Sequence, residues 1–130
     1  MTVFVDTSAL LATLDADDMN HASASDVLRR YVDAPLVTHN YVVLETTALL
    51  QRRFGLAAVR LLSERLLPAL TVVWIDADRH ERAMTSLLTR RRRSVSLVDW
   101  ASFDLMRERG IQDAFAYDDD FSREGFTLVN

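Results

Sequence analysis

The sequence contains neither cysteine nor lysine. The absence of cysteine excludes disulfide bonds and zinc sites built from thiolates. All 15 basic residues are arginine, which excludes mechanisms that need a catalytic or phosphate-binding lysine. No apolar run approaches the roughly 18 residues of a membrane span. The first eight residues lack the basic start and apolar stretch of a secretory signal, so we expect a cytoplasmic protein without a membrane segment.

The length and composition are those of one globular domain that spans residues 1–130. Hydrophobic residues make up 49% of the chain and charged residues 26%, which is enough apolar surface to build a core. The net charge is −4. An acidic chain is a poor ligand for nucleic acid unless its acids gather at one place where a metal ion neutralises them.

Short apolar segments alternate with helical patterns along the chain. We predict strands over residues 2–5, 36–39, 71–74, 114–117 and 127–129. We predict helices over residues 8–14, 21–33, 41–54, 56–67, 79–92 and 97–109, with Asp78 and Glu81 as a capping box for the helix over 79–92. This alternation predicts an α/β fold with a parallel sheet covered by helices on both faces. In such folds, functional sites form at the carboxyl ends of the strands.

Two acidic residues lie at positions where a carboxylate is expected to cap a helix, form an ion pair or bind a metal ion. Asp6 directly follows the first strand, where it either caps the next helix or contributes to a site. Thr7 and Ser8 either orient Asp6 or cap that helix themselves. Glu45 has only apolar neighbours on its helix face, and a carboxylate there needs an arginine partner or a metal ion.

The other two candidates are Asp99 and one member of the run Asp118-Asp119-Asp120. Asp99 has the capping-box spacing with Ser96, and it also lies at a helix start near the carboxyl edge of the sheet. Asp118 is the first residue after the predicted strand 114–117, and it points into the same crevice as Asp6. Asp119 points away. Asp120 points back into the crevice if the chain stays extended and outward if it turns, so we favour Asp118 and place Asp120 at the rim.

The four acids Asp6, Glu45, Asp99 and Asp118 are therefore expected to converge. Two carboxylates about 4 Å apart repel by about 4 kcal/mol at an effective dielectric constant near 20. A hard divalent cation, Mg²⁺ or Mn²⁺, would compensate this repulsion through oxygen ligands.

Four segments resemble those of a known family: VFVDTSALLA, YVVLETTALL around Glu45, SLVDWASFDLMRERGI and AFAYDDDFSREGF. Together they resemble the PIN-domain ribonucleases, in particular the VapC toxins of type II toxin–antitoxin systems. The resemblance implies a three-layer α/β/α fold with a short, mainly parallel sheet, and a Mg²⁺-dependent endoribonuclease. It assigns the catalytic and metal-binding roles to Asp6, Glu45, Asp99 and Asp118. Ala116 departs from the family pattern, because many relatives carry Thr or Ser there.

The resemblance also implies partners: an RNA substrate, a second copy of the chain, and a small antitoxin that lies across a hydrophobic groove. The alternative function is a catalytically weak PIN-like module that binds RNA or protein. A response regulator is excluded by the missing lysine, and a haloacid-dehalogenase-type phosphatase by the missing D-x-D-x-T. The run Arg90–Arg93 either contacts RNA or complements a helix dipole. We expect His21, His39 and His80 to be surface or capping residues, and Asp104 to be solvated.

Overall fold

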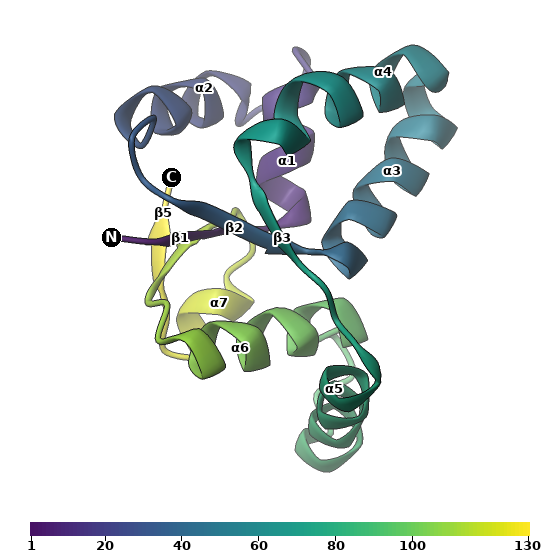
Figure 1. The fold of residues 1–130 in the computed structure, drawn as a ribbon, viewed down its shortest axis with the longest axis vertical. Helices are drawn as coiled ribbons and strands as arrows, with labels where there is room; N and C mark the ends of the chain where they lie inside the picture. Colours follow the sequence, from purple (N-terminus) through teal and green to yellow (C-terminus); the bar gives the residue numbers. More distant parts are fainter.

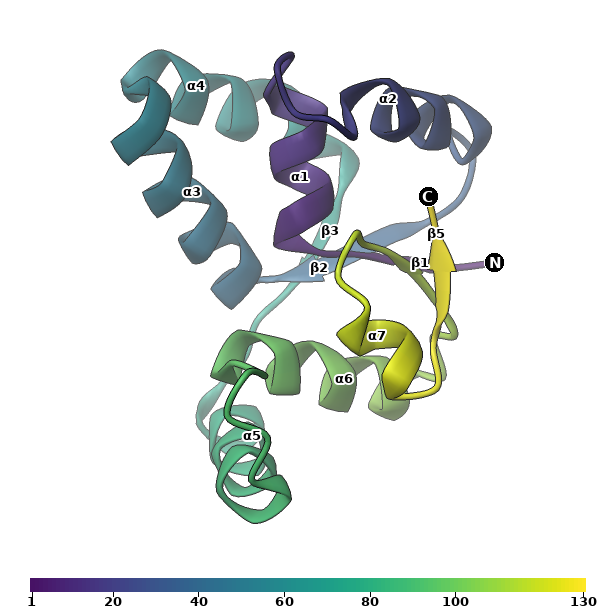
Figure 2. The same cartoon turned by 180° about the vertical axis from the view of Figure 1, so that it is seen from behind.

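A five-stranded, entirely parallel sheet forms the centre of the computed structural model, which describes all of residues 1–130 (Figures 1 and 2). The strands lie in the order β3-β2-β1-β4-β5. Their bounds are β1 Val3–Val5, β2 Leu36–His39, β3 Thr71–Val73, β4 Asp113–Phe115 and β5 Thr127–Val129. The three central strands are mostly buried, as expected for short apolar segments covered on both faces.

Helices cover both faces of the sheet. Figure 1 shows α1 (Thr7–Leu14), α2 (His21–Arg30), α3 (Asn40–Phe54) and α4 (Leu56–Leu61) on one side. On the other side lie α5 (Ala77–Arg90), α6 (Leu97–Arg109) and the short α7 (Asp120–Arg123). The predicted three-layer α/β/α architecture is therefore confirmed. None of these helices is both long and apolar enough to span a membrane.

An aromatic cluster attaches α6 and α7 to the sheet. Phe4 in β1 stacks on Phe121 in α7, with ring centroids 6.1 Å apart. Phe103 in α6 meets Phe121 edge to face at 4.9 Å. All three side chains are fully buried. Aromatic pairs in these arrangements are worth about 1 kcal/mol each beyond their buried area, so the cluster holds the segment after β4 in a fixed place.

A buried histidine connects the two helices that carry Glu45 and Asp99. His39 ends β2 and caps α3, and its Nδ1 accepts a hydrogen bond from the Val42 backbone N–H. Its Nε2 contacts the Ser102 hydroxyl of α6 at 2.8 Å. His39 is completely buried, and burial lowers its pKa from 6.5 to about 3. The capping role is as predicted, but the residue belongs to the core rather than to the surface.

Several predicted element ends are wrong by a few residues. The helix predicted over 79–92 is α5, which begins at Ala77, ends at Arg90 and is capped by Asp76, whose carboxylate accepts from the Arg79 N–H at 3.0 Å. Asp78 therefore lies in the first turn and does not cap the helix. Either aspartate suits a cap, and the turn that follows β3 selects the earlier one.

Three further segments are shorter or less regular than predicted. The helix predicted over 56–67 is α-helical only to Leu61, and a π-helical turn and a 3₁₀ turn follow it. Pro68 has no N–H to continue an α-helix, which accounts for the 3₁₀ turn over Leu67–Ala69. The helix α2 ends at Arg30 rather than at 33. The strand β4 ends at Phe115, so two residues separate it from Asp118.

Candidate active site

All four acids that the sequence singled out line one open hollow at the carboxyl edge of the sheet. Its volume is about 290 Å³. It is lined by Asp6, Thr7, Ser8, Leu11, Glu45, Leu49, Ser96, Asp99 and Asp118. The strands β1 and β4 pair in register up to Val5 and Phe115, and the Asp6 N–H donates to the Phe115 carbonyl at 3.0 Å. The chain segments that carry Asp6 and Asp118 therefore leave the sheet side by side.

Asp6 caps α1 and is also part of the hollow. It is only 5% exposed. Its Oδ2 accepts hydrogen bonds from the Ser8 hydroxyl at 2.7 Å and from the Ser8 N–H at 3.2 Å. The same hydroxyl accepts from the Tyr117 N–H at 3.0 Å. Ser8 thus orients Asp6 and ties the segment after β1 to the segment after β4.

Thr7 contributes a polar atom without a partner. Its Oγ1 is buried and makes no hydrogen bond, although the residue lines the hollow. A buried hydroxyl without a partner is unfavourable in protein alone, so this atom favours a bound water or ligand group at the site.

Asp99 both caps the helix α6 and lines the hollow. It forms a capping box with Ser96: the Ser96 N–H donates to Asp99 Oδ2 at 3.1 Å, and the Asp99 N–H donates to Ser96 Oγ at 3.2 Å. This pair of bonds fixes Asp99 at the start of α6, with its carboxylate at the hollow.

Glu45 has no arginine partner. Neither Glu45 nor any of the other three acids of the hollow forms a salt bridge, whereas Asp76, Glu108, Asp120 and Glu124 each pair with arginine. The ion-pair explanation that the sequence left open for Glu45 is therefore wrong. Four carboxylates share this hollow without a cation from the protein.

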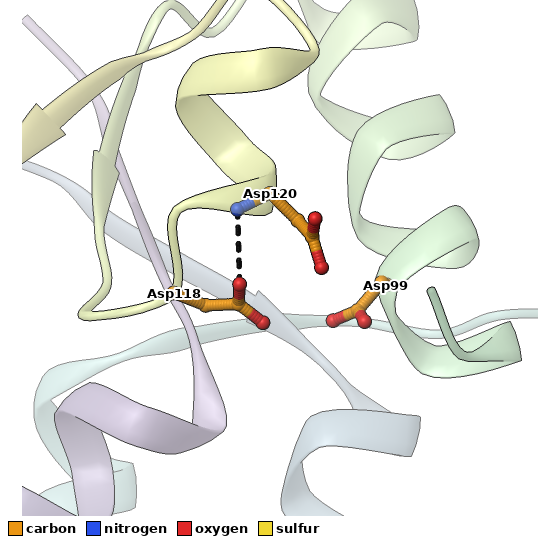
Figure 3. Close-up of side chains that lie close together, drawn as sticks. All are labelled: Asp99, Asp118 and Asp120. Atoms are coloured by element: carbon orange, nitrogen blue, oxygen red, sulfur yellow. Dashed lines mark hydrogen bonds between the residues drawn. The ribbon is translucent and has the colours of Figure 1, made fainter. Parts of the chain in front are cut away.

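The run Asp118-Asp119-Asp120 turns sharply into α7. Asp119 is exposed, as predicted. Asp118 Oδ1 accepts from the Asp120 N–H at 2.9 Å. Carboxylate oxygens of Asp99, Asp118 and Asp120 lie within 4.8 Å of one another, and Figure 3 shows all three groups pointing into the same space.

Asp120 does not lie at the rim as predicted. It is 6% exposed, and its Oδ1 accepts from Arg92 Nη2 at 3.0 Å and from Arg123 Nη1 at 3.1 Å. We expected an extended backbone to point this side chain into the crevice and a turn to point it outward. The chain does turn, but α7 begins at Asp120 and the side chain still lies inward. Asp120 therefore joins the acidic cluster as a residue whose charge the protein already compensates.

Burial and mutual repulsion raise the pKa values of two of these acids. The pKa of Asp6 rises from 3.8 to about 6, first because of burial and then because of the charge on Asp99, against the lowering effect of the Ser8 hydrogen bonds. The pKa of Asp99 also rises to about 6, through burial and through the charges of Asp118 and Glu45. Both shifts show that the ionised site is unfavourable on its own.

The donor set fits a hard divalent cation. Every candidate ligand is an oxygen atom, several carboxylates converge, and none of the four acids of the hollow has a cationic partner. Mg²⁺ and Mn²⁺ prefer such ligands, whereas softer metals select imidazole and thiolate groups, which this hollow lacks. Asp6, Glu45, Asp99 and Asp118 are the residues that could hold the ion, with Asp120 beside them.

Sequence reasoning missed two contacts around the site and misplaced Asp120 and Asp104. The role of Ser8 as a link between two loops and the pairing of Arg92 with Asp120 depend on contacts between distant segments. The only local indication that Asp120 belongs to the site was its position two residues after Asp118, because residues two apart point the same way on an extended chain. Asp104, predicted to be solvated, is half-buried away from the hollow, where burial raises its pKa and the Ser86 hydroxyl donates to it at 3.1 Å.

Comparison with known proteins gives a consistent result. Residues 3–126 match the PIN domain family. The chain is 41% identical over 130 residues to VapC20 of Mycobacterium tuberculosis, a 23S rRNA-specific endonuclease, and the match covers 98% of this chain and 97% of the relative.

Solved structures show the same likeness. The crystal structure of Mycobacterium tuberculosis VapC20, a sarcin-ricin loop cleaving toxin, superposes with a TM-score of 0.83 at 40% identity and covers 96% of both chains. PAE2754 from Pyrobaculum aerophilum has a TM-score of 0.66 at 17% identity and covers 99% of this chain and 90% of its own. FitAcB from Neisseria gonorrhoeae has a TM-score of 0.68 at 11% identity, with 98% and 96% covered. The last two support the fold alone.

We predict that Asp6→Asn stabilises the metal-free protein at pH 7.5. The raised pKa of Asp6 corresponds to about 3 kcal/mol of stability that is present below pH 3.8 and lost as the pH rises through about 6. Asparagine keeps an oxygen for the Ser8 hydrogen bonds without the charge. Thermal unfolding in EDTA should show a melting temperature several degrees above wild type at pH 7.5, and a smaller difference at pH 5. The low pKa of His39 affects the stability of both proteins equally, so its effect cancels in the difference between their melting temperatures. A less stable variant at pH 7.5 would contradict the assigned repulsion.

We also predict that the three consecutive aspartates differ in Mn²⁺ binding. Asp118→Asn removes an unpaired carboxylate from the cluster and should weaken Mn²⁺ binding by about tenfold or more. Asp120→Asn should weaken it by a few fold, because one Asp120 oxygen already serves two arginines. Asp119→Asn is the matched exposed control and should change nothing. Isothermal titration with Mn²⁺ measures all three. A larger effect at Asp120 than at Asp118 would make Asp120 the principal ligand.

Proposed function

This chain belongs to the PIN domain family as a VapC-type endoribonuclease, and we propose that it is a toxin that cleaves the sarcin–ricin loop of 23S ribosomal RNA. The support for this substrate is the likeness to VapC20 along nearly the whole chain. Because ribosomal RNA is the proposed substrate, we place the action of the enzyme in the cytoplasm.

The observation that carries the catalytic proposal is the group of four carboxylates without a protein cation in one hollow. We assign Asp6, Glu45, Asp99 and Asp118 to the binding of Mg²⁺, with Mn²⁺ as a substitute. When bound, such an ion polarises a phosphodiester group and lowers the pKa of water. Hydrolysis by water would leave a 5′-phosphate and a 3′-hydroxyl.

The protein's own contribution is to hold these carboxylates in place. Ser8 fixes Asp6 and the segment that leads to Asp118, and Ser96 fixes Asp99. Glu45 lines the hollow without any hydrogen bond to another protein group. Its carboxylate is therefore free to bind the ion directly or through a water molecule, which is the role we assign to it.

We propose that the exposed apolar surface on α3 and β3 joins two copies of this chain. Leu44 is 69% exposed and Trp74 is 68% exposed. Both line an apolar hollow of about 420 Å³ together with Asn40, Val43, Thr47, Leu67 and Val72. The neighbouring β3 is an edge strand of the sheet. Apolar patches of this kind mark protein interfaces, and a two-fold axis would place the patch against itself.

The antitoxin would then cover a second apolar surface. Phe54 at the end of α3 and Leu56 and Leu61 of α4 are also largely exposed. This helical hairpin lies on the opposite side of the molecule from α5 and α6 (Figure 1). A small antitoxin with an amphipathic helix would bury these side chains.

We predict metal-dependent cleavage of 23S ribosomal RNA. The purified protein should cut the sarcin–ricin loop with Mg²⁺ and not with EDTA. Asp99→Asn should lower the rate by about 100-fold or more, because a charge at the site is lost while the shape is kept. Asp119→Asn is the control that should keep wild-type activity. Primer extension across the loop locates the cut.

Two results of this experiment would count against the proposal. Cleavage that is unchanged by EDTA or by Asp99→Asn would contradict the assigned site. Wild-type protein that binds the RNA but never cuts it would favour the alternative of a catalytically weak binding module.

We predict that Trp74→Glu converts a dimer into a monomer. A charge in the centre of the apolar patch is unfavourable to bury, so the dissociation constant should rise by about 100-fold. Val32→Glu is the matched control, since Val32 is at least as exposed as Trp74 but follows α2 at another part of the surface. Sedimentation velocity of both variants measures the state. A Trp74→Glu protein that remains a dimer would place the interface elsewhere.

A further inference from the structure

The connection between α5 and α6 contains a backbone conformation that its sequence does not favour. Arg91 has φ 56° and ψ 31°, and it is the only non-glycine residue of the chain with positive φ. Helices that end in this left-handed conformation usually place glycine or asparagine there. A side chain at such a position is strained, and strained residues persist where the surroundings impose them, often at functional sites.

The two arginines on either side of Arg91 impose this conformation. Arg90 Nη2 donates to both carboxylate oxygens of Glu124 at 3.3 Å, and Arg92 Nη1 donates to Glu124 Oε2 at 2.7 Å. Arg107 also donates to Glu124 at 3.0 Å. The Glu124 side chain is only 4% exposed, so this is a semi-buried anchor rather than a loose surface pair. With residues 90 and 92 held by one carboxylate, residue 91 must turn outward.

The outward residues carry free charges. Arg91 and Arg93 are exposed, and neither forms a hydrogen bond or a salt bridge with the rest of the chain. A role in complementing the helix dipole explains Arg90 and the C-cap residue Arg91, but not Arg93, which lies two residues beyond the cap. A run of arginines that is simply exposed to solvent would not explain the strained backbone at Arg91 either.

This arginine turn, residues 90–93, lies beside the acidic hollow. Arg92 joins the two, since its Nη2 donates to Asp120, which is part of the cluster with Asp99 and Asp118. The connection continues to Ser96, which lines the hollow. Figure 2 shows the connection between α5 and α6 leading into the first turn of α6. Around the turn, six arginines (90, 91, 92, 93, 107 and 123) face three carboxylates, those of Asp104, Asp120 and Glu124, which leaves the turn net positive.

We propose that Arg91 and Arg93 contact the RNA backbone next to the cleaved phosphodiester. This rests on the proposed ribonuclease function. An acidic hollow repels RNA, and a net positive turn on its border would bring the polyanion to the site. Guanidinium groups suit phosphate oxygens, and preorganised ones lose less freedom on binding. The two flanking arginines are positioning residues, and the two exposed ones make the contact.

The test compares two pairs of exposed arginines. The probe is a fluorescent hairpin RNA with the sarcin–ricin loop sequence, and its binding is followed by anisotropy over a range of salt concentrations in an Asp99→Asn background. Arg91→Gln with Arg93→Gln should weaken binding by about tenfold at low salt and reduce the slope of log K against log salt by about 1.5. Arg52→Gln with Arg53→Gln is the control. It removes the same charge from the last turn of α3, where both arginines are exposed and unpaired.

A second variant separates RNA contact from a structural role. Arg91→Gly relieves the left-handed backbone, so its melting temperature should rise by about 3 °C while RNA affinity falls. If Arg91 had only a structural role, the melting temperature and the RNA affinity of Arg91→Gly would change in the same direction, or the RNA affinity would not change.

The outcomes distinguish a failure of the arginine contact from a failure of the proposed ribonuclease function. Equal RNA affinity and salt slope for the 91/93 pair and the 52/53 pair would overturn the arginine contact and leave the ribonuclease function standing. No salt-dependent RNA binding even by the parent protein would overturn both. A loss that is confined to the 91/93 pair, with unchanged melting of the double variant, supports the contact.

Discussion

The central constraint on this structure is the repulsion among carboxylates that the fold brings to one edge of its sheet. Asp6, Glu45, Asp99 and Asp118 share a hollow and have no salt bridge. Burial and mutual repulsion raise the pKa values of Asp6 and Asp99 to about 6, which shows that their ionised forms oppose folding. Other parts of the protein must hold these groups together against that repulsion. Hydrogen bonds from the Ser8 hydroxyl and from the backbone N–H groups of Ser8 and Ser96 do so locally, and the aromatic cluster around Phe121 does so at longer range.

The parallel sheet explains why acids so far apart in sequence meet. Each strand ends at the same edge, and the segments that follow β1 and β4 leave it in adjacent positions. The helix α3 follows β2 directly and carries Glu45, and α6 is fixed to α3 through the buried contact between His39 and Ser102. Because the strands and the His39–Ser102 contact are buried, the spacing of the site depends on the core, and a change in the core would alter the hollow.

Much of this arrangement is readable from the sequence. Strand positions, most helices and the four acids follow from apolar patterns and from acids placed directly after strands or on apolar helix faces. What was missed depends on contacts between distant segments. No local pattern indicates that Arg92 pairs with Asp120, so that acid was placed at a solvated rim. The cap of α5 was shifted by two residues because Asp76 and Asp78 suit the role equally, and only the turn after β3 selects one.

Arg92 connects two regions of opposite charge. Its guanidinium group reaches Asp120 with one nitrogen and Glu124 with another, at 3.0 and 2.7 Å. A lysine has a single nitrogen and could not hold both carboxylates in fixed directions, which gives a physical meaning to the exclusive use of arginine at this turn. Because the same side chain neutralises one acid of the cluster and anchors the arginine turn, the acidic hollow and its basic border cannot be arranged independently. A chain with a net charge of −4 can therefore present a local positive surface to a phosphodiester without losing the carboxylates that would act on it.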